Sequence, residues 1–124
     1  MCMIEYGDGP EFWHEKSQTA RKEHRCDECS RQIRRGEVYW YAFGKCDGYT
    51  YEAKTCSHCR VACEWLNRNC HGFVYQAVIE DFGEHAEDNL PMLRIVVGAR
   101  RQWQSFADPS RLLPVPADPP DMHA

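Results

Sequence analysis

The sequence predicts a small α+β domain, and three features of its 124 residues support this prediction. Two Cys-x-x-Cys pairs, at residues 26–29 and 56–59, indicate that two separate parts of the chain meet at one metal site. Between the pairs, residues 38–43 and 49–54 repeat with a period of two, which is typical of paired β-strands. After the second pair, apolar residues recur at helical spacing. The length corresponds to about one domain.

The four paired cysteines predict a tetrahedral zinc site. A two-residue spacer lets both thiolates of a pair turn inward from one tight loop, and two such loops supply the four soft ligands that Zn²⁺ prefers. In a chain of this size, a structural zinc contributes about 10 kcal/mol or more of apparent folding free energy. We expect Cys56→Ser to release the metal and Cys46→Ser to change little. The expected zinc ligands are Cys26, Cys29, Cys56 and Cys59.

Disulfide bonds are the alternative use of the cysteines, because the chain contains eight of them. Residues 1–9 lack the basic start and apolar run of a secretory signal, and no stretch has the length of a membrane helix. We therefore expect a reducing cytoplasm, no association with membranes, and metal binding in place of disulfides.

The segment between the two pairs is predicted to be a β-hairpin followed by a helix. Gly44, Asp47 and Gly48 supply the turn chemistry between the two strands. The helix is expected to start at the second pair and to stop near Asn69 and Gly72. Its apolar stripe consists of Val61, Ala62, Trp65 and Leu66.

This order of knuckle, hairpin, knuckle and helix resembles the treble-clef zinc fingers over residues 24–69, including the Ile-Arg-Arg-Gly-Glu run at 33–37 that enters the first strand. The resemblance implies that Cys26 and Cys29 lie on the first knuckle and Cys56 and Cys59 in the first helical turn. It implies little about function, because this fold serves many roles. The chain is also similar to small zinc proteins of bacterial viruses and prophages. That resemblance implies a phage protein in the host cytoplasm that inhibits a host or defence protein.

The other cysteines and two histidines offer further ligands. Cys63 follows Cys59 by one helical turn, so it is expected to pack near the metal or to replace a ligand. A second site from Cys63, Cys70 and His71 stays open, although none of them forms a Cys-x-x-Cys pair. Small buried side chains are expected at Cys2, Cys46 and Cys70, and surface or supporting roles at His24 and His58.

Two more helices are expected before a Pro-rich tail. The first spans residues 74–82 on an apolar stripe, and the second spans 92–106, with a strand over 93–97 as the alternative. Gly98 weakens the second helix. We expect one domain over residues 1–106, with a zinc module at 24–69 and a helical part at 73–106. Residues 107–124 are expected to be an extended or disordered tail, attached if at all through Leu112, Leu113 and Val115.

Catalysis is not expected. A nuclease of the HNH kind would need a histidine in the hairpin region, and none lies between residues 29 and 56. A zinc deaminase would need proline before a cysteine pair, which is absent here. A thioredoxin-like enzyme would need a βαβ context, which the sequence does not predict.

Binding is the expected activity, with two alternatives. A protein partner is preferred, because a rigid zinc module presents aromatic and arginine side chains, which are common at protein interfaces. The first C-terminal helix also carries an acidic face. This face suits a basic groove on a partner, or mimics nucleic acid there. Nucleic acid is the alternative, although a net charge of −4 gives no overall attraction to phosphate. The acidic residues are Glu80, Asp81, Glu84, Glu87 and Asp88, and the basic residues at the first knuckle are Arg21, Lys22, Arg25, Arg31, Arg34 and Arg35.

Overall fold

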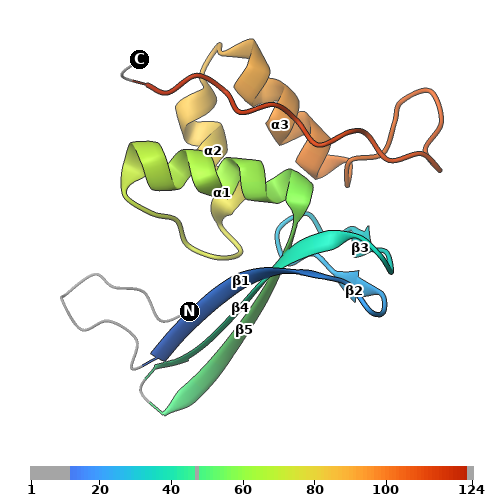
Figure 1. The fold of residues 1–124 in the computed structure, drawn as a ribbon. Coiled ribbons are helices and arrows are strands. Elements are labelled where there is room, and N and C mark those ends of the chain that lie inside the picture. Colours follow the sequence, from blue (N-terminus) through green and yellow to red (C-terminus); the bar gives the residue numbers. More distant parts are fainter. Residues whose placement is uncertain (1–11, 47, 123–124) are drawn as a thin grey trace.

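The computed structural model describes residues 12–46 and 48–122, which form an α+β fold as the sequence predicts (Figure 1). The predictions for the leader at residues 1–9, for Cys2 and for Asp47 lie outside the described residues, as does the side chain of Cys46. The described elements are β1 (Phe12–Thr19), β2 (His24–Arg25), β3 (Gln32–Ile33), β4 (Val38–Cys46), β5 (Tyr49–Cys56), α1 (Ser57–Cys70), α2 (Val78–Ala86) and α3 (Leu90–Arg100).

The predicted hairpin is confirmed as strands β4 and β5, which pair antiparallel from Tyr39 opposite Cys56 to Cys46 opposite Tyr49. Gly44 was expected in the turn but lies within β4, opposite Tyr51, because the strands continue past it. Strand β1 adds to the other edge of β4, giving the order β1-β4-β5. The sequence did not predict β1, because its side chains from residue 14 onward are exposed or half-buried and show no apolar alternation.

The first cysteine pair lies in a short loop between β2 and β3. The loop is closed by two backbone hydrogen bonds, from Cys26 N to Arg31 O at 2.9 Å and from Ser30 N to Cys26 O at 2.9 Å. Ser30 adopts the left-handed conformation with φ of 66°, which completes the reversal of the chain. The loop therefore directs two cysteine side chains toward the same point.

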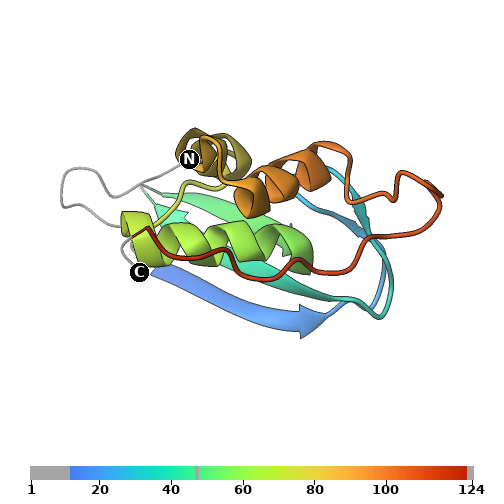
Figure 2. The ribbon, with the colours of Figure 1, turned by 90° about the horizontal axis from the view of Figure 1, so that it is seen from above.

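The three helices form a layer on one face of the three-stranded sheet (Figures 1 and 2). Trp65 of α1 and Phe82 of α2 are fully buried, and their rings meet edge to face with centroids 5.4 Å apart. The four paired cysteines belong to the same buried cluster as these rings. The metal site is thus one end of the hydrophobic core.

Helix α2 begins at Val78, so the expected start at residue 74 was wrong. Residues 74–77 form a turn in which Ala77 N donates to Val74 O, and Gln76 has φ of 73°. The carboxylate of Glu28, from the first cysteine loop, accepts hydrogen bonds from Gln76 N at 2.7 Å and Val78 N at 3.3 Å. Glu28 therefore satisfies backbone donors at the start of α2 and sets where the helix begins.

Helix α3 settles the alternative at residues 93–97 in favour of a helix, but it ends at Arg100 and not at residue 106. Gln102 and Trp103 follow in the left-handed conformation, with φ of 56° and 60°, and turn the chain back. Trp103 is buried, whereas Phe106 is 72% exposed, so the expected stripe does not extend to Phe106.

The tail runs extended along α1 up to residue 122 (Figure 2). Trp65 Nε1 donates to Pro120 O at 3.0 Å, and Met122 N donates to Asn69 Oδ1 at 2.9 Å. Leu112 and Val115, two of the three expected anchors, are 36% and 52% exposed. Hydrogen bonds with α1 therefore hold this segment. Among the described residues, no helix is long and apolar enough to cross a membrane. The division into a domain and a tail at residue 107 stays a prediction.

Candidate metal centre

Four cysteine sulfurs meet at the junction between the first loop, strand β5 and helix α1. The Sγ atoms of Cys26, Cys29, Cys56 and Cys59 all lie within 4.8 Å of one another, and all four side chains are buried. The Sγ atoms of Cys29 and Cys56 are 3.9 Å apart. A tetrahedral zinc with Zn–S bonds of about 2.3 Å places its sulfurs about 3.8 Å apart, so the spacing fits such an ion.

The second pair is positioned by the start of α1. Cys56 is both the last residue of β5 and the N-cap of the helix, where its sulfur accepts a hydrogen bond from Cys59 N at 3.5 Å. Cys56 N in turn donates to Cys26 Sγ at 3.4 Å. Backbone donors and the positive end of the helix both favour thiolates at this position.

The protonation of the four thiols is coupled because they are so close. Hydrogen bonds with Cys26, Cys29 and Cys59 hold the pKa of Cys56 well below that of an ordinary thiol. Hydrogen bonds with Cys26, Cys29 and Cys56, together with burial, raise the pKa of Cys59 well above that of an ordinary thiol. Four thiolates at this spacing therefore need a cation among them, and a metal ion would supply that charge.

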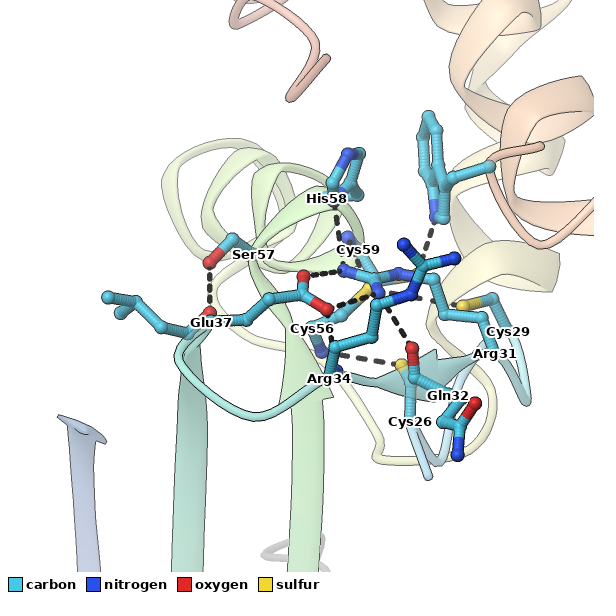
Figure 3. Close-up of polar contacts among 12 residues, drawn as sticks. Cys26, Cys29, Arg31, Gln32, Arg34, Glu37, Cys56, Ser57, His58 and Cys59 are labelled. Atoms are coloured by element: carbon cyan, nitrogen blue, oxygen red, sulfur yellow. Dashed lines mark hydrogen bonds and ion pairs between the residues drawn. The ribbon is translucent and has the colours of Figure 1, made fainter. Parts of the chain in front are cut away.

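Arg31 places a second positive charge beside the sulfurs (Figure 3). Only 4% of its side chain is exposed, and its guanidinium forms a forked ion pair with Glu37, at 2.8 and 3.1 Å. Burial alone lowers the pKa of Arg31, but the bonds with Glu37 and the nearby Cys56 sulfur raise it above the usual value. The charged guanidinium thus offsets part of the negative charge of the sulfur cluster.

His58 supports Arg31 beside the metal site. Its Nε2–H donates to Leu113 O at 2.6 Å, which leaves Nδ1 as the acceptor for an Arg31 N–H at 3.2 Å. These partners require the Nε2–H tautomer. Both ring nitrogens are therefore engaged, in agreement with the supporting role expected from the sequence. His24 lies beside Tyr39 instead, at 3.4 Å from its hydroxyl.

Trp103 covers the other side of the cluster. Its Nε1 donates to Cys59 Sγ at 3.4 Å, and its backbone N donates to Gly98 O at 2.7 Å. The ring lies against Gly98, where a Cβ would fall 2.6 Å from the Cε3 atom of Trp103. The sequence predicted that Gly98 weakens the helix. Its lack of a side chain leaves room for the Trp103 ring.

We expect Gly98→Ala to destabilise the protein by about 1–3 kcal/mol, although alanine is the better helix former, because the added methyl displaces the Trp103 ring. Denaturant unfolding of the metal-loaded protein measures the loss. Gly83→Ala is the matched control, since a Cβ there meets only Val96, at 3.7 Å. Equal stability of Gly98→Ala and the wild type would contradict the packing argument.

Cys63 and Cys70, the other cysteines whose side chains the structure describes, do not join the cluster. Cys63 is fully buried, and burial raises the pKa of its thiol, so it stays a neutral core side chain. Cys70 contacts His85, with Sγ and Nε2 3.4 Å apart. Within the described residues, the four paired cysteines are the only group of three or more ligands close enough for a metal, so Cys63, Cys70 and His71 do not assemble a second site.

The basic and acidic surfaces predicted from the sequence consist mostly of exposed residues, with one exception in each. Arg31 is internal, whereas the other basic residues of the first knuckle, Arg21, Lys22, Arg25, Arg34 and Arg35, are exposed. On and after α2, Asp81 is half-buried and the remaining acidic residues, Glu80, Glu84, Glu87 and Asp88, are exposed. The sequence reasoning missed the roles of Glu28, Glu37 and Trp103. Glu28 and Trp103 act on residues far along the chain, whereas Glu37 binds Arg31 only six positions away.

Comparisons of this chain with protein-family models, with curated proteins and with solved structures find no match. Membership of the treble-clef group and a viral origin therefore stay predictions from the sequence.

Proposed function

We propose that the four cysteines hold one structural Zn²⁺. The donor set supports zinc, because four thiolates in tetrahedral spacing favour it over harder ions such as Mg²⁺ and Ca²⁺. The surroundings support a structural role. All four sulfur ligands are buried, and Arg31 and Trp103 occupy the space around them, whereas a catalytic zinc keeps a position open for water or substrate. We propose on this basis that the protein is not an enzyme.

We also propose that residues 24–69 form a treble-clef finger. The supporting observation is the order of elements: a short loop with one cysteine pair, the β4–β5 hairpin, and a helix whose first turn carries the second pair. This assignment concerns the scaffold only and leaves the function to the surfaces of the molecule.

The function we propose is binding of a protein partner through the acidic face of α2. The observation that carries it is the contact between Glu28 and the start of α2, which fixes this helix to the metal module. Glu80 and Glu84 on this helix and Glu87 directly after it are exposed. A rigid row of carboxylates suits a basic groove on a partner, because pre-organised charges lose little conformational entropy on binding. Inhibition of such a partner is the role that we propose for it.

Affinity capture from bacterial lysate tests this function, using zinc-loaded protein with and without nuclease digestion. We expect a discrete protein to be retained after digestion and to be lost when Glu80 and Glu84 are both replaced by lysine. Replacing Glu52 and Asp118 by lysine is the matched control, because both are exposed and give the same change in net charge elsewhere. Loss of all bound material on digestion would contradict the proposal and favour nucleic-acid binding.

A further inference from the structure

A hollow of about 220 Å³ lies between the first cysteine loop and the chain that follows α3. Arg31 and Arg34 line it from one side, and Gln102, Gln104 and Arg111 line it from the other. Three arginines and no carboxylate contribute to its wall. In a molecule with a net charge of −4, such a concentration of positive charge marks a place for an anion.

The arginines of this hollow are not all neutralised by the protein. Arg31 pairs with Glu37, yet its buried Nε has no hydrogen-bond partner. The side chains of Arg34 and Arg111 are exposed, and neither guanidinium has an ion pair within the described residues. In Figure 3 the side chain of Arg34 extends toward the guanidinium of Arg31. Because Arg31 and Arg34 line the same hollow, an anion held there can contact both side chains.

The donors in the hollow match the oxygens of a phosphate group. Guanidinium groups present forked N–H donors that fit phosphate, and such charge-assisted bonds are stronger than neutral ones. The amides of Gln102 and Gln104 add further N–H donors at the same wall. A monovalent anion such as chloride would engage few of these donors, whereas phosphate has enough oxygens to engage several.

A second hollow, of about 590 Å³, adjoins the first and shares Gln32 and Gln102 with it. Glu23, His24, Arg25 and Ser30 also line it, and the Glu23 carboxylate accepts a hydrogen bond from the Gln32 amide. Its volume falls in the usual range for ligand sites, about 300–1,000 Å³. Amide, imidazole and guanidinium groups are the side chains that recognise the edges and faces of nucleobases. A phosphate in the first hollow therefore has room beside it for the rest of a nucleotide.

We propose that the hollow between the first cysteine loop and residues 102–111 binds a phosphate group, carried by a free nucleotide or by a nucleic-acid strand. This site lies apart from the acidic face of α2 and does not depend on the proposed protein partner. It uses the metal centre only as the support of Arg31.

Calorimetric titration of the zinc-loaded full chain tests the site with three probes: inorganic phosphate, adenosine monophosphate and a single-stranded oligothymidylate. We expect Arg34→Gln and Arg111→Gln each to weaken binding about tenfold, the effect of losing a charge-assisted hydrogen bond. Arg35→Gln is the matched control, because Arg35 is exposed next to Arg34 but does not line the hollow. We expect it to change the affinity less than about twofold.

The probes distinguish the sources of the phosphate. Tighter binding of the mononucleotide than of inorganic phosphate identifies a nucleotide, and a further gain with the oligothymidylate identifies a strand. Equal losses for Arg34→Gln, Arg111→Gln and Arg35→Gln would overturn the proposal in favour of diffuse attraction, as would no detectable binding of any probe at millimolar concentration. The Arg31 Nε–H resonance gives a second readout, since it is expected to shift on binding in the wild type and to reach the same shift in Arg111→Gln only at about tenfold higher probe concentration.

Discussion

Replacing Cys56 by serine is expected to abolish zinc binding and to unfold the part of the protein between the two cysteine pairs. Cys56 ends β5, its sulfur caps α1 by accepting from Cys59 N, and the same sulfur lies 3.9 Å from Cys29 Sγ in the first loop, so its thiolate joins all three elements of the site. The apparent binding free energy of a structural zinc, about 10–16 kcal/mol, equals or exceeds the whole stability of a typical domain, about 5–15 kcal/mol. Metal analysis is expected to find one zinc per wild-type chain and none in the variant, which should also show no cooperative thermal transition.

Cys70→Ser is the control for this experiment. Cys70 is half-buried, and its sulfur contacts only His85 among the described hydrogen-bond partners. We expect this variant to keep its zinc and to change in stability by less than about 1 kcal/mol. Retention of zinc by Cys56→Ser, or equal losses in the two variants, would show that the ligand set is wrong.

Replacing Arg31 by methionine is the second change with a large expected effect. The substitution leaves the Glu37 carboxylate without its forked partner and His58 Nδ1 without its donor. Removing one member of a buried ion pair costs about 3–5 kcal/mol. Because Glu37 is 23% exposed and keeps the hydrogen bond from Arg34 N, we expect a loss at the low end of this range, about 3 kcal/mol. Denaturant unfolding with zinc at saturation measures the loss, and Arg35→Met, an exposed arginine four positions along, is expected to stay within about 0.5 kcal/mol of the wild type.

The double variant Arg31→Met with Glu37→Leu tests the cause of that loss. If the unpaired carboxylate is responsible, the second substitution recovers much of the stability, because an apolar pair can replace a buried ion pair. Arg31→Lys is expected to lie between the wild type and Arg31→Met, since lysine keeps the charge without the fork. A double variant no more stable than Arg31→Met would assign the effect to the sulfur cluster instead of Glu37.

The sequence predicted the parts of the fold that depend on local patterns. The spacing within each cysteine pair, the period-two strands and the stripe on α1 are all contained in short segments, and each corresponds to an observed element. Strand β1 was not predicted because its residues 14–19 are polar and exposed or half-buried, so its pairing with β4 left no apolar alternation there. A period-two pattern appears in a sequence only where one face of a strand is apolar and buried. Residues 14–19 are polar on both faces, so they show no such pattern.

The residues around the metal site were less predictable, and for Glu28 and Trp103 the reason is the long separation over which they act. Glu28 caps a helix that starts about 50 positions later, and Trp103 reaches a sulfur 44 positions earlier. The charge of Arg31 placed it among the surface cations in the sequence, whereas its pairing with Glu37 places it inside. The partner of Arg31 is Glu37, which follows the turn at residues 35–36. No local sequence pattern shows that an arginine with such a partner is buried.

The contact between Trp103 and the sulfur cluster bears on the order in which the site is assembled during synthesis. Cys59 is made 44 residues before Trp103, and His58 is made 55 residues before the Leu113 carbonyl that it binds. At about 5–20 residues per second, the last ligand precedes its cover by about 2–9 s. The nascent chain thus has a complete set of thiolates open to zinc before the C-terminal residues close over them. Once those residues are in place, exchange of the ion with solvent requires the chain to open again.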